Sequence, residues 1–249
     1  MAGKVIVITG ANGGLGRALS RRFASDGESV VMLGRNPEKI TAAAADVGMG
    51  AWAVQCEIGN PDSVRTAFAT IAERHPTIDV LINNAGYFQP FILSEATDQQ
   101  IMDGINGNLL GAILCSRSAI PMMPKGGKII HVTSESVTWN YAMLTIYTAG
   151  KTGLERFSRA LQEELWDEKT GIRSIIFRAG QMYGDGISGA MDEAIIGKFM
   201  AANERRGIRP PDRGYSSYDT VAKMMRSVVD MPDDVTIDVI ACASVHAGN

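Results

Sequence analysis

The stretch VIVITGANGGLGRAL, residues 5–19, decides the fold of this chain. An apolar run over residues 4–9 predicts a strand buried on both faces, and four glycines and a helical pattern from about residue 15 follow it. A glycine turn at this position lets the backbone approach a ligand, and the free N–H groups of the next helix favour an anion. The stretch therefore predicts a pyrophosphate-binding turn, with a simple tight turn and capping glycines as the alternative.

The rest of the chain alternates β-prone runs with longer helical patterns. Further strands are predicted over 29–34, 51–56, 127–134, 172–178 and 235–241, and residues 79–86 are predicted to form a strand and then a turn. Helices are predicted over 15–24, from residue 37, and over 60–74, 98–122, 147–168 and 218–229. This order predicts an α/β fold, a Rossmann-type doubly wound parallel sheet of about seven strands with helices on both faces. Since no linker or internal repeat interrupts it, we expect one domain over residues 1–249.

Composition argues against several classes of function. The 249 residues carry a net charge of −3 and a pI near 5.7, so neither nucleic acid nor a membrane surface is an expected partner. No apolar run approaches the roughly 18 residues that a membrane span needs, and no secretory signal is visible, so a cytoplasmic protein is expected. The cysteines and histidines are scattered without ligand spacing, which predicts no metal site.

The end of the second predicted strand reads LGRN and bears on the choice of coenzyme. In dinucleotide-binding folds this position meets the adenosine ribose, where a carboxylate binds the 2′-hydroxyl and an arginine suits a 2′-phosphate. Here Gly34, Arg35 and Asn36 occupy the place, without a carboxylate. These residues favour NADP(H) over NAD(H). The alternative is that Arg35 is only a solvated surface charge.

Tyr147 and Lys151 form the sequence YTAGK, which places them on one face of a predicted helix. A free tyrosine has a pKa of about 10, and a nearby ammonium favours the phenolate and lowers that pKa. A tyrosine held in this way can pass a proton to or from a substrate oxygen. Taken alone, the pair is better explained by an ordinary amphipathic helix.

Two further features end strands at the same predicted edge of the sheet. Ser134 closes the run GKIIHVTS, and the sequence NNAG (residues 83–86) ends the run before it. Ligands of such folds bind at the carboxyl ends of the strands, so both features lie where Tyr147 is expected. An Asx turn with a glycine is the alternative explanation of NNAG.

As a set, TGxxxGxG (Thr9 to Gly16), NNAG, Ser134, YxxxK and the strand–helix order resemble the short-chain dehydrogenase/reductase family, in its branch of roughly 250 residues. The match spans residues 4 to about 180 and weakens afterwards. The glycine spacing differs from the GxGxxG fingerprint, and no Gly-Lys-Ser/Thr of a P-loop follows it.

The resemblance implies a role for four residues. Tyr147 would be the general acid/base, Lys151 would lower its pKa and hold the nicotinamide ribose, and Ser134 would hydrogen-bond the substrate oxygen. Asn108, in the sequence NLLG, would support a water relay to the lysine, with Asn106 as the rival. The implied reaction is hydride transfer between NADP(H) and a carbonyl or secondary alcohol.

The resemblance also implies cofactor contacts around the glycine turn and along the strand ends, with Glu57-Ile58 in place of the usual aspartate. The implied cofactor-binding residues are Gly10, Asn12, Gly13, Gly14, Leu15, Gly16, Arg35, Asn36, Glu57, Ile58, Asn84, Ala85, Gly86, Tyr147, Lys151, Gly180 and Met182. The family commonly has Pro-Gly and then Thr after the sixth strand; here Gly180 is kept and the other two are not. We therefore expect the backbone around Met182 to hold the nicotinamide amide.

Aromatic and methionine side chains in 87–95, 135–146 and 181–214 predict an apolar or aromatic small-molecule substrate. Trp139, Tyr141 and Tyr183 are the expected substrate contacts, with packing between subunits as the alternative. The glycine-rich segment 181–214 is expected to form a lid. The resemblance implies a homodimer or homotetramer built on the helices 98–122 and 147–168.

Two other functions fit parts of the sequence. A non-catalytic, NADP(H)-sensing Rossmann protein is one, but such relatives tend to lose the tyrosine or the lysine, and both are present. A sugar-nucleotide epimerase or dehydratase is the other, but those chains are longer and usually show TGxxGxxG.

Overall fold

A parallel sheet of seven strands forms the centre of the molecule, in the order β3-β2-β1-β4-β5-β6-β9. The computed structural model describes residues 3–184, 192–208 and 214–243. The strands are β1 (Val5–Thr9), β2 (Ser29–Gly34), β3 (Trp52–Gln55), β4 (Val80–Asn83), β5 (Lys128–Ser134), β6 (Arg173–Ala179) and β9 (Val239–Cys242). Every neighbouring pair is parallel, which confirms the predicted fold class.

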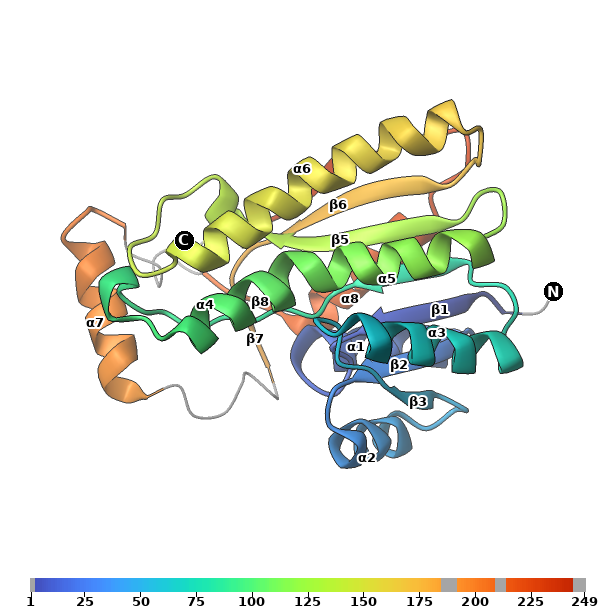
Figure 1. Cartoon of the computed structure of the whole chain (residues 1–249), viewed down its shortest axis with the longest axis horizontal. Coiled ribbons are helices and arrows are strands. Elements are labelled where there is room, and N and C mark those ends of the chain that lie inside the picture. Colours follow the sequence, from blue (N-terminus) through green and yellow to red (C-terminus); the bar gives the residue numbers. More distant parts are fainter. Residues whose placement is uncertain (1–2, 185–191, 209–213, 244–249) are drawn as a thin grey trace.

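Helices cover both faces of the sheet (Figure 1). They are α1 (Gly14–Ser25), α2 (Pro37–Val47), α3 (Pro61–Arg74), α4 (Asp98–Ile105), α5 (Gly111–Ala119), α6 (Thr145–Asp167), α7 (Glu193–Glu204) and α8 (Tyr218–Val229). The side chains of α1, α2 and α8 form one buried core with one face of the strands, and those of α3, α5 and α6 form a second core on the other face. The strands read as continuous apolar runs because both of their faces are covered.

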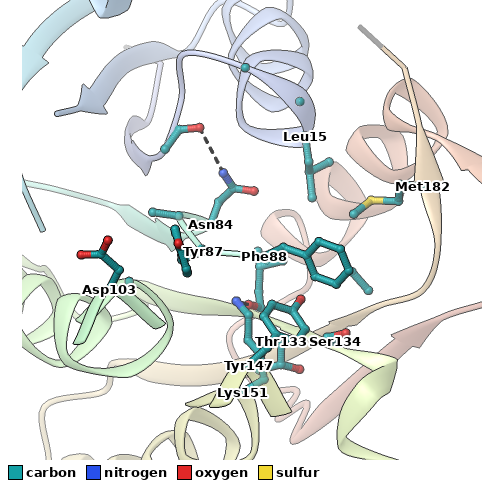
Figure 2. A pocket seen from close by; sticks show the side chains of 18 of the residues that line it. Leu15, Asn84, Tyr87, Phe88, Asp103, Thr133, Ser134, Tyr147, Lys151 and Met182 are labelled. Atoms are coloured by element: carbon teal, nitrogen blue, oxygen red, sulfur yellow. Dashed lines mark hydrogen bonds between the residues drawn. The ribbon is translucent and has the colours of Figure 1, made fainter. Parts of the chain in front are cut away.

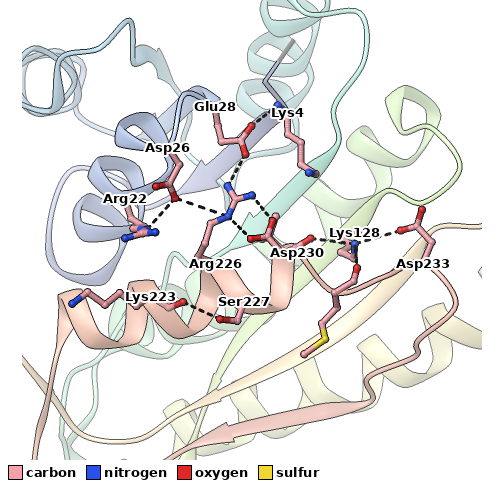
Figure 3. Close-up of polar contacts among 12 residues, drawn as sticks. Lys4, Arg22, Asp26, Glu28, Lys128, Lys223, Arg226, Ser227, Asp230 and Asp233 are labelled. Carbon is pink, nitrogen blue, oxygen red and sulfur yellow. Dashed lines mark hydrogen bonds and ion pairs between the residues drawn. The ribbon is translucent and has the colours of Figure 1, made fainter. Parts of the chain in front are cut away.

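A charged cluster holds α8 against α1 and the start of β2, at the end of the sheet away from the strands' carboxyl ends (Figure 3). Arg226 of α8 donates over 2.6 Å to Glu28, which precedes β2, and over 2.7 Å to Asp230, the C-cap of α8 itself. The Lys128 ammonium donates to the carbonyl of Val229, the last residue of α8, and to that of Met231, just beyond the helix. These bonds satisfy carbonyls that a helix C-terminus leaves without partners.

Sequence and structure differ most after residue 180. The final strand begins at Val239 instead of residue 235, and α7 lies within a segment for which no element was predicted. A short parallel pair, β7 (Met182–Tyr183) and β8 (Ser216–Ser217), joins the two ends of that segment. The part of the predicted lid over 185–191 and 209–213 lies outside the described residues.

The predicted helix 98–122 is interrupted rather than uniform. Between α4 and α5, residues Asn106–Leu110 form a π-helical segment, and a 3₁₀ turn over Ile120–Met122 ends the whole element. Single π-turns inside α-helices are frequent at functional sites. The segment lies beside the point where the strand order reverses, between β1 and β4, and ligands of doubly wound sheets bind at that point.

Candidate active site

The glycine turn after β1 lies at the reversal point and is built for close backbone approach. Gly10 has φ +64° and Gly14 has φ +51°, a region that side chains disfavour. A Cβ on Gly10 would lie 2.8 Å from the Ala85 Cα, so the turn packs directly on the chain after β4. The N-cap of α1 is Gly13, which offers no side-chain acceptor, so the first N–H groups of the helix remain available to a ligand.

Thr9 and Asn84 join this turn to the NNAG segment. The Thr9 hydroxyl accepts from the backbone N–H groups of Asn84 and Ala85, each over 3.0 Å. The Asn84 carboxamide donates to the Thr9 carbonyl over 2.9 Å. The Asn84 carboxamide therefore holds the end of β1 against the segment after β4. Thr9, which in the sequence is recognisable only as part of the TGxxxGxG motif, positions this segment.

A single pocket of about 1410 Å³ runs from the end of β2, past the glycine turn, to β5 and α6. Fifteen of the seventeen residues implied as cofactor contacts line it: Gly10, Asn12, Gly13, Gly14, Leu15, Arg35, Glu57, Ile58, Asn84, Ala85, Gly86, Tyr147, Lys151, Gly180 and Met182.

The other two implied cofactor contacts, Gly16 and Asn36, do not line the pocket but support it. A Cβ on Gly16 would lie 2.3 Å from the Gly10 carbonyl oxygen, so this glycine lets α1 close against the turn. The Asn36 side chain accepts from the backbone of Lys39 and caps α2.

Arg35 is exposed and lines the pocket at the end of β2, as expected for a residue that meets the adenosine ribose. Lys39, on the first turn of α2, lines the same end and was not singled out in the sequence. Its place in the first turn of α2, just after Arg35 and the end of β2, was the available signal. Two cations, Arg35 and Lys39, therefore line this end of the pocket.

Tyr147, Lys151 and Ser134 come together on one side of the pocket, opposite Leu15 and Met182 (Figure 2). The Lys151 side chain is 3% exposed; its ammonium donates to the Val132 carbonyl over 2.8 Å and lies 5.9 Å from the centre of the Tyr147 ring. Ser134 ends β5 and makes a hydrogen bond with the Tyr147 side chain. The three side chains predicted to carry the chemistry thus meet at the carboxyl edge of the sheet.

The pKa of the Tyr147 phenol is raised, which differs from the sequence-based expectation. Burial is the main cause, the hydrogen bond with Ser134 opposes it, and the Glu135 carboxylate adds to the rise. Burial also lowers the pKa of the Lys151 ammonium to about 8, so near that pH part of its charge is lost. Tyr147 is therefore a neutral phenol in this structure, the form that donates a proton.

Asn108 lies in the π-helical segment and is buried with the chain after β4 rather than exposed to the pocket. Its carboxamide oxygen accepts from the Tyr87 N–H over 3.1 Å, and its nitrogen donates to the Tyr87 and Gly104 carbonyls. A Cβ on Gly86 would lie 3.1 Å from this oxygen and 3.3 Å from the Lys151 ammonium. Asn108 thus fixes the backbone that passes over the lysine, whereas its rival Asn106 lines the pocket.

The outer end of the pocket is walled by apolar and aromatic side chains from several elements. Phe88 packs edge-on against Tyr147 with ring centres 5.1 Å apart, and Tyr141 lies 6.3 Å from Phe199 of α7. The buried side chain of Asn203, also on α7, accepts from the Ala142 N–H over 2.8 Å and so ties α7 to the loop after β5.

Of the three expected substrate contacts, Tyr141 lines the pocket, and Trp139 and Tyr183 do not. Tyr183 follows Met182 in a strand, where successive side chains point to opposite sides, so Met182 faces the pocket and Tyr183 is 54% exposed. Trp139 is 42% exposed, beyond the 3₁₀ turn that follows Ser134. Phe88 and Phe199 take the aromatic positions instead.

The end of β6 shows how the missing Pro and Thr are accommodated. A Cβ on Gly180 would lie 2.6 Å from the Cys242 carbonyl, so the glycine is required by the approach of β9. After it, the Gln181 carbonyl accepts from the Ser216 N–H over 3.0 Å, and Met182 pairs with Ser216. This pairing fixes the backbone that was expected to meet the nicotinamide amide.

Comparison with known proteins agrees with this geometry. The family model described as short chain dehydrogenase matches residues 4–186. The chain belongs to the short-chain dehydrogenase family. It is therefore an oxidoreductase of the hydride-transferring kind.

Individual relatives are distant. A 3beta-hydroxysteroid dehydrogenase of Mediterraneibacter gnavus is 32% identical over 64% of this chain and 59% of its own length. The 3-oxoacyl-[acyl-carrier-protein] reductase MabA of Mycobacterium avium is 30% identical over 76% of this chain and 71% of its own. The closed form of a serine dehydrogenase complexed with NADP+ aligns over 98% of both chains with a TM-score of 0.83 and 24% identity, which shows the shared fold.

Two further observations concern the part of the chain that the structure describes. Within it, no helix combines the length and the apolar character of a membrane span. No group of three or more His, Cys, Asp or Glu side chains gathers there in a way that suits a metal ion.

Proposed function

We propose that this short-chain dehydrogenase transfers a hydride between NADP(H) and a carbonyl or secondary alcohol, with Tyr147 as the general acid/base. The observation that carries the proposal is the meeting of Tyr147, Ser134 and Lys151 at one end of a pocket that also contains the glycine turn. NADP(H), when bound, supplies the hydride. The proposal includes a single domain, a cytoplasmic location and a homodimer or homotetramer.

Two features of the glycine turn and of α1 suit the binding of a dinucleotide in this pocket. The glycine turn carries no side chain at Gly10, where a Cβ would collide with Ala85. The first turn of α1, residues 14–17, contains Arg17 and no acidic residue. Both features suit a pyrophosphate, because the helix N-terminus favours negative charge. We assign the other implied contacts that line the pocket to the remainder of the coenzyme.

The residues of the chain then divide the proton chemistry. The Ser134 hydroxyl binds the substrate oxygen and polarises the carbonyl, and the Tyr147 phenol donates a proton to that oxygen during reduction. The Lys151 ammonium stabilises the phenolate that remains, because an opposite charge at short range favours the ionised form. Asn108 holds the Tyr87 backbone in place beside the lysine, and Phe88 covers the reacting groups.

The pair Arg35 and Lys39 supports a preference for NADP(H). We expect Arg35→Asp to lower the ratio of kcat/KM with NADPH to that with NADH by about 10- to 100-fold, the value of one or two charge-assisted hydrogen bonds. Steady-state kinetics with both coenzymes measure the ratio. Arg21→Asp makes the same charge change at a position that pairs with Asp46 outside the pocket, and it should leave the ratio as it is. An unchanged ratio in the Arg35 variant would show that this arginine is only a surface charge.

The lowered pKa of Lys151 predicts the pH dependence of coenzyme use. Because kcat/KM for NADPH reports groups of the free enzyme, it should be constant below pH 8 and fall above it, as an ammonium with a pKa of about 8 loses its proton. Lys151→Arg stays protonated over this range, so its profile should be lower in absolute value but without the inflection. The same inflection in both proteins would assign the titration to another group.

The substrate, in this proposal, has an apolar or aromatic body. Phe88, Leu144, Phe199 and Met200 line the outer end of the pocket, and apolar walls with a few polar groups are typical of small-molecule sites. Because α7 supplies part of this wall, we assign a lid function to the segment that contains it.

A further inference from the structure

Cys56 and Cys115 lie together beside the pocket, although they are far apart in the chain. Cys56 follows β3 and Cys115 belongs to α5, and their thiol groups are hydrogen-bonded to each other. Both are free cysteines in the core that α3, α5 and α6 form with the sheet. The mechanism proposed above gives this cysteine pair no role.

The segment that follows β3 packs closely along the helices that lead to the second cysteine. A Cβ on Gly59 would lie 2.9 Å from the Asn106 Cβ, and a Cβ on Gly111 would lie 2.5 Å from the Ile58 Cδ1. The cysteine pair is the next contact in this series, one helical turn after Gly111. The two thiols are therefore held together by the packing of their backbones.

One member of the pair, Cys56, can be reached from the pocket. It lines the pocket with Glu57 and Ile58, two of the implied cofactor contacts. Its N–H donates to the Gly34 carbonyl over 2.9 Å, which fixes it beside the end of β2. Cys115, by contrast, has no exposed surface. A small oxidant that enters the pocket therefore meets Cys56 first, and a coenzyme bound at this end would cover it.

The hydrogen bond between the thiols gives them different reactivity. It lowers the pKa of Cys56, against the effects of burial and of the Glu57 carboxylate. Together with burial, it raises the pKa of Cys115. Cys56 is therefore the thiol that ionises more readily, and the thiolate is the form that reacts with oxidants.

Hydrogen peroxide can oxidise this pair in two steps. The Cys56 thiolate attacks one peroxide oxygen, the O–O bond breaks, and a sulfenic acid and a hydroxide form. The Cys115 sulfur then attacks the Cys56 sulfur, and the sulfenic oxygen leaves as water with the Cys115 proton. The hydroxide takes up the proton that Cys56 had released. In sum, two thiols are oxidised to one disulfide, and one hydrogen peroxide is reduced to two water molecules.

We propose that Cys56 and Cys115 are an oxidation site, at which hydrogen peroxide forms a disulfide and bound coenzyme prevents its formation. An S–S bond of about 2.0 Å is much shorter than the contact between two unbonded sulfur atoms, so the disulfide draws the segment of Glu57 and Ile58 towards α5. Transient disulfides of this kind occur in redox-sensing proteins of reducing compartments. The oxidation is independent of the proposed function, whereas the protection by coenzyme rests on it.

Peptide mapping of the oxidised protein tests the proposal. Trypsin places the three cysteines in separate peptides, residues 40–65, 75–117 and 227–249. The protein is treated with hydrogen peroxide, free thiols are alkylated, and the digest is analysed by mass spectrometry without reduction. We expect the first two peptides to be linked, with two hydrogens fewer than their sum, and to separate after treatment with dithiothreitol. NADP+ at about ten times its Kd should slow the linkage about 10-fold, because only the free protein reacts.

The oxidised protein should also bind NADPH more weakly. A displaced Glu57 segment removes about one hydrogen bond to the coenzyme, so the Kd should rise about 3- to 10-fold and return to its original value after dithiothreitol. Fluorescence titration of NADPH binding measures this change. An unchanged Kd in the fully linked protein would show that the disulfide leaves the coenzyme site as it was.

Two variants separate the pair from the third cysteine. Cys242→Ser alters a cysteine of β9, at the opposite edge of the sheet from β3, so the disulfide should form at the wild-type rate. In Cys115→Ala, Cys56 has no partner thiol and the reaction should stop at the sulfenic acid, which dimedone labels in the peptide of residues 40–65.

The other outcomes overturn the inference in distinguishable ways. If no linked peptides form, or if only Cys242 reacts, the pair is not an oxidation site. If they form equally fast with NADP+ bound, the oxidant does not reach Cys56 through the pocket, and the protection by coenzyme is wrong. If neither NADP+ nor NADPH binds, the proposed function fails, whereas the linked peptides would still establish the oxidation site.

Discussion

Tyr147→Phe should reduce carbonyl turnover by about 100- to 10,000-fold, the usual contribution of a positioned general acid. In the proposed mechanism the phenol hydroxyl donates the proton, and phenylalanine keeps the ring that packs against Phe88. NADPH affinity should change little, because the glycine turn and Lys151 are untouched. Single-turnover absorbance measurements of NADPH oxidation, together with a fluorescence titration of NADPH binding, separate the two effects.

Tyr183→Phe is the matched control. The same hydroxyl is removed from a tyrosine that is 54% exposed and does not line the pocket, so turnover and binding should both stay at the wild-type level. Wild-type turnover in Tyr147→Phe would show that the proton comes from another group and would remove the basis of the proposed mechanism.

Gly16→Ala should abolish coenzyme binding and destabilise the fold, although Gly16 does not line the pocket. The added Cβ would lie 2.3 Å from the Gly10 carbonyl oxygen and 2.6 Å from the Asn84 side-chain nitrogen. Since both neighbours belong to the turn and to the segment after β4, the helix has to move away from the turn. Overpacking of this kind costs about 1–3 kcal/mol in the free energy of unfolding. Denaturant unfolding and NADPH titration measure the two losses.

Gly197→Ala is the matched control, because it adds the same methyl group to a helical glycine whose Cβ position is not crowded. Among the described residues, no atom outside its own helical turn lies within 4 Å of the position of its Cβ in α7. Alanine should therefore stabilise that helix by about 0.5–1 kcal/mol, with NADPH affinity unchanged. If Gly16→Ala were as stable as this control and bound NADPH normally, the close packing between α1 and the turn would not be needed.

The sequence predicted the parts of the fold that local patterns determine. β1, β2, α3 and α8 begin or end at or next to the predicted residues, because each is bounded by a glycine, a cap such as Asn60, or a change of hydrophobic period. The same patterns place Ser134 and Tyr147 at the carboxyl edge of the sheet. That they meet there follows from the parallel order of the strands, not from their spacing along the chain.

Tertiary contacts decide what the sequence did not predict. The π-helical segment at Asn108 depends on its hydrogen bonds with Tyr87, which lies far from it in the chain. Likewise, α7 is held by Asn203 against the loop at Ala142, and no local signal marks that contact. Strand pairing with β8 determines which of Met182 and Tyr183 faces the pocket.

Burial explains the remaining difference, the direction of the Tyr147 pKa. The spacing of YxxxK indicates a nearby ammonium, but it carries no information on how far the two groups are removed from water. In the structure, burial raises the pKa of the phenol and lowers that of the ammonium to about 8. The neutral phenol and the partly charged lysine favour proton donation, which is the direction of carbonyl reduction.

The most direct test of the account follows the hydride itself. NADPH carrying deuterium at the reactive carbon of the nicotinamide is mixed with the protein and a panel of apolar and aryl ketones, and the products are analysed by mass spectrometry. We expect one deuterium on the carbinol carbon with the wild type, and a transfer at least about 100-fold slower with Tyr147→Phe, because a positioned general acid contributes about this much. Tight coenzyme binding without deuterium in any product, or equal transfer by the two proteins, would contradict it.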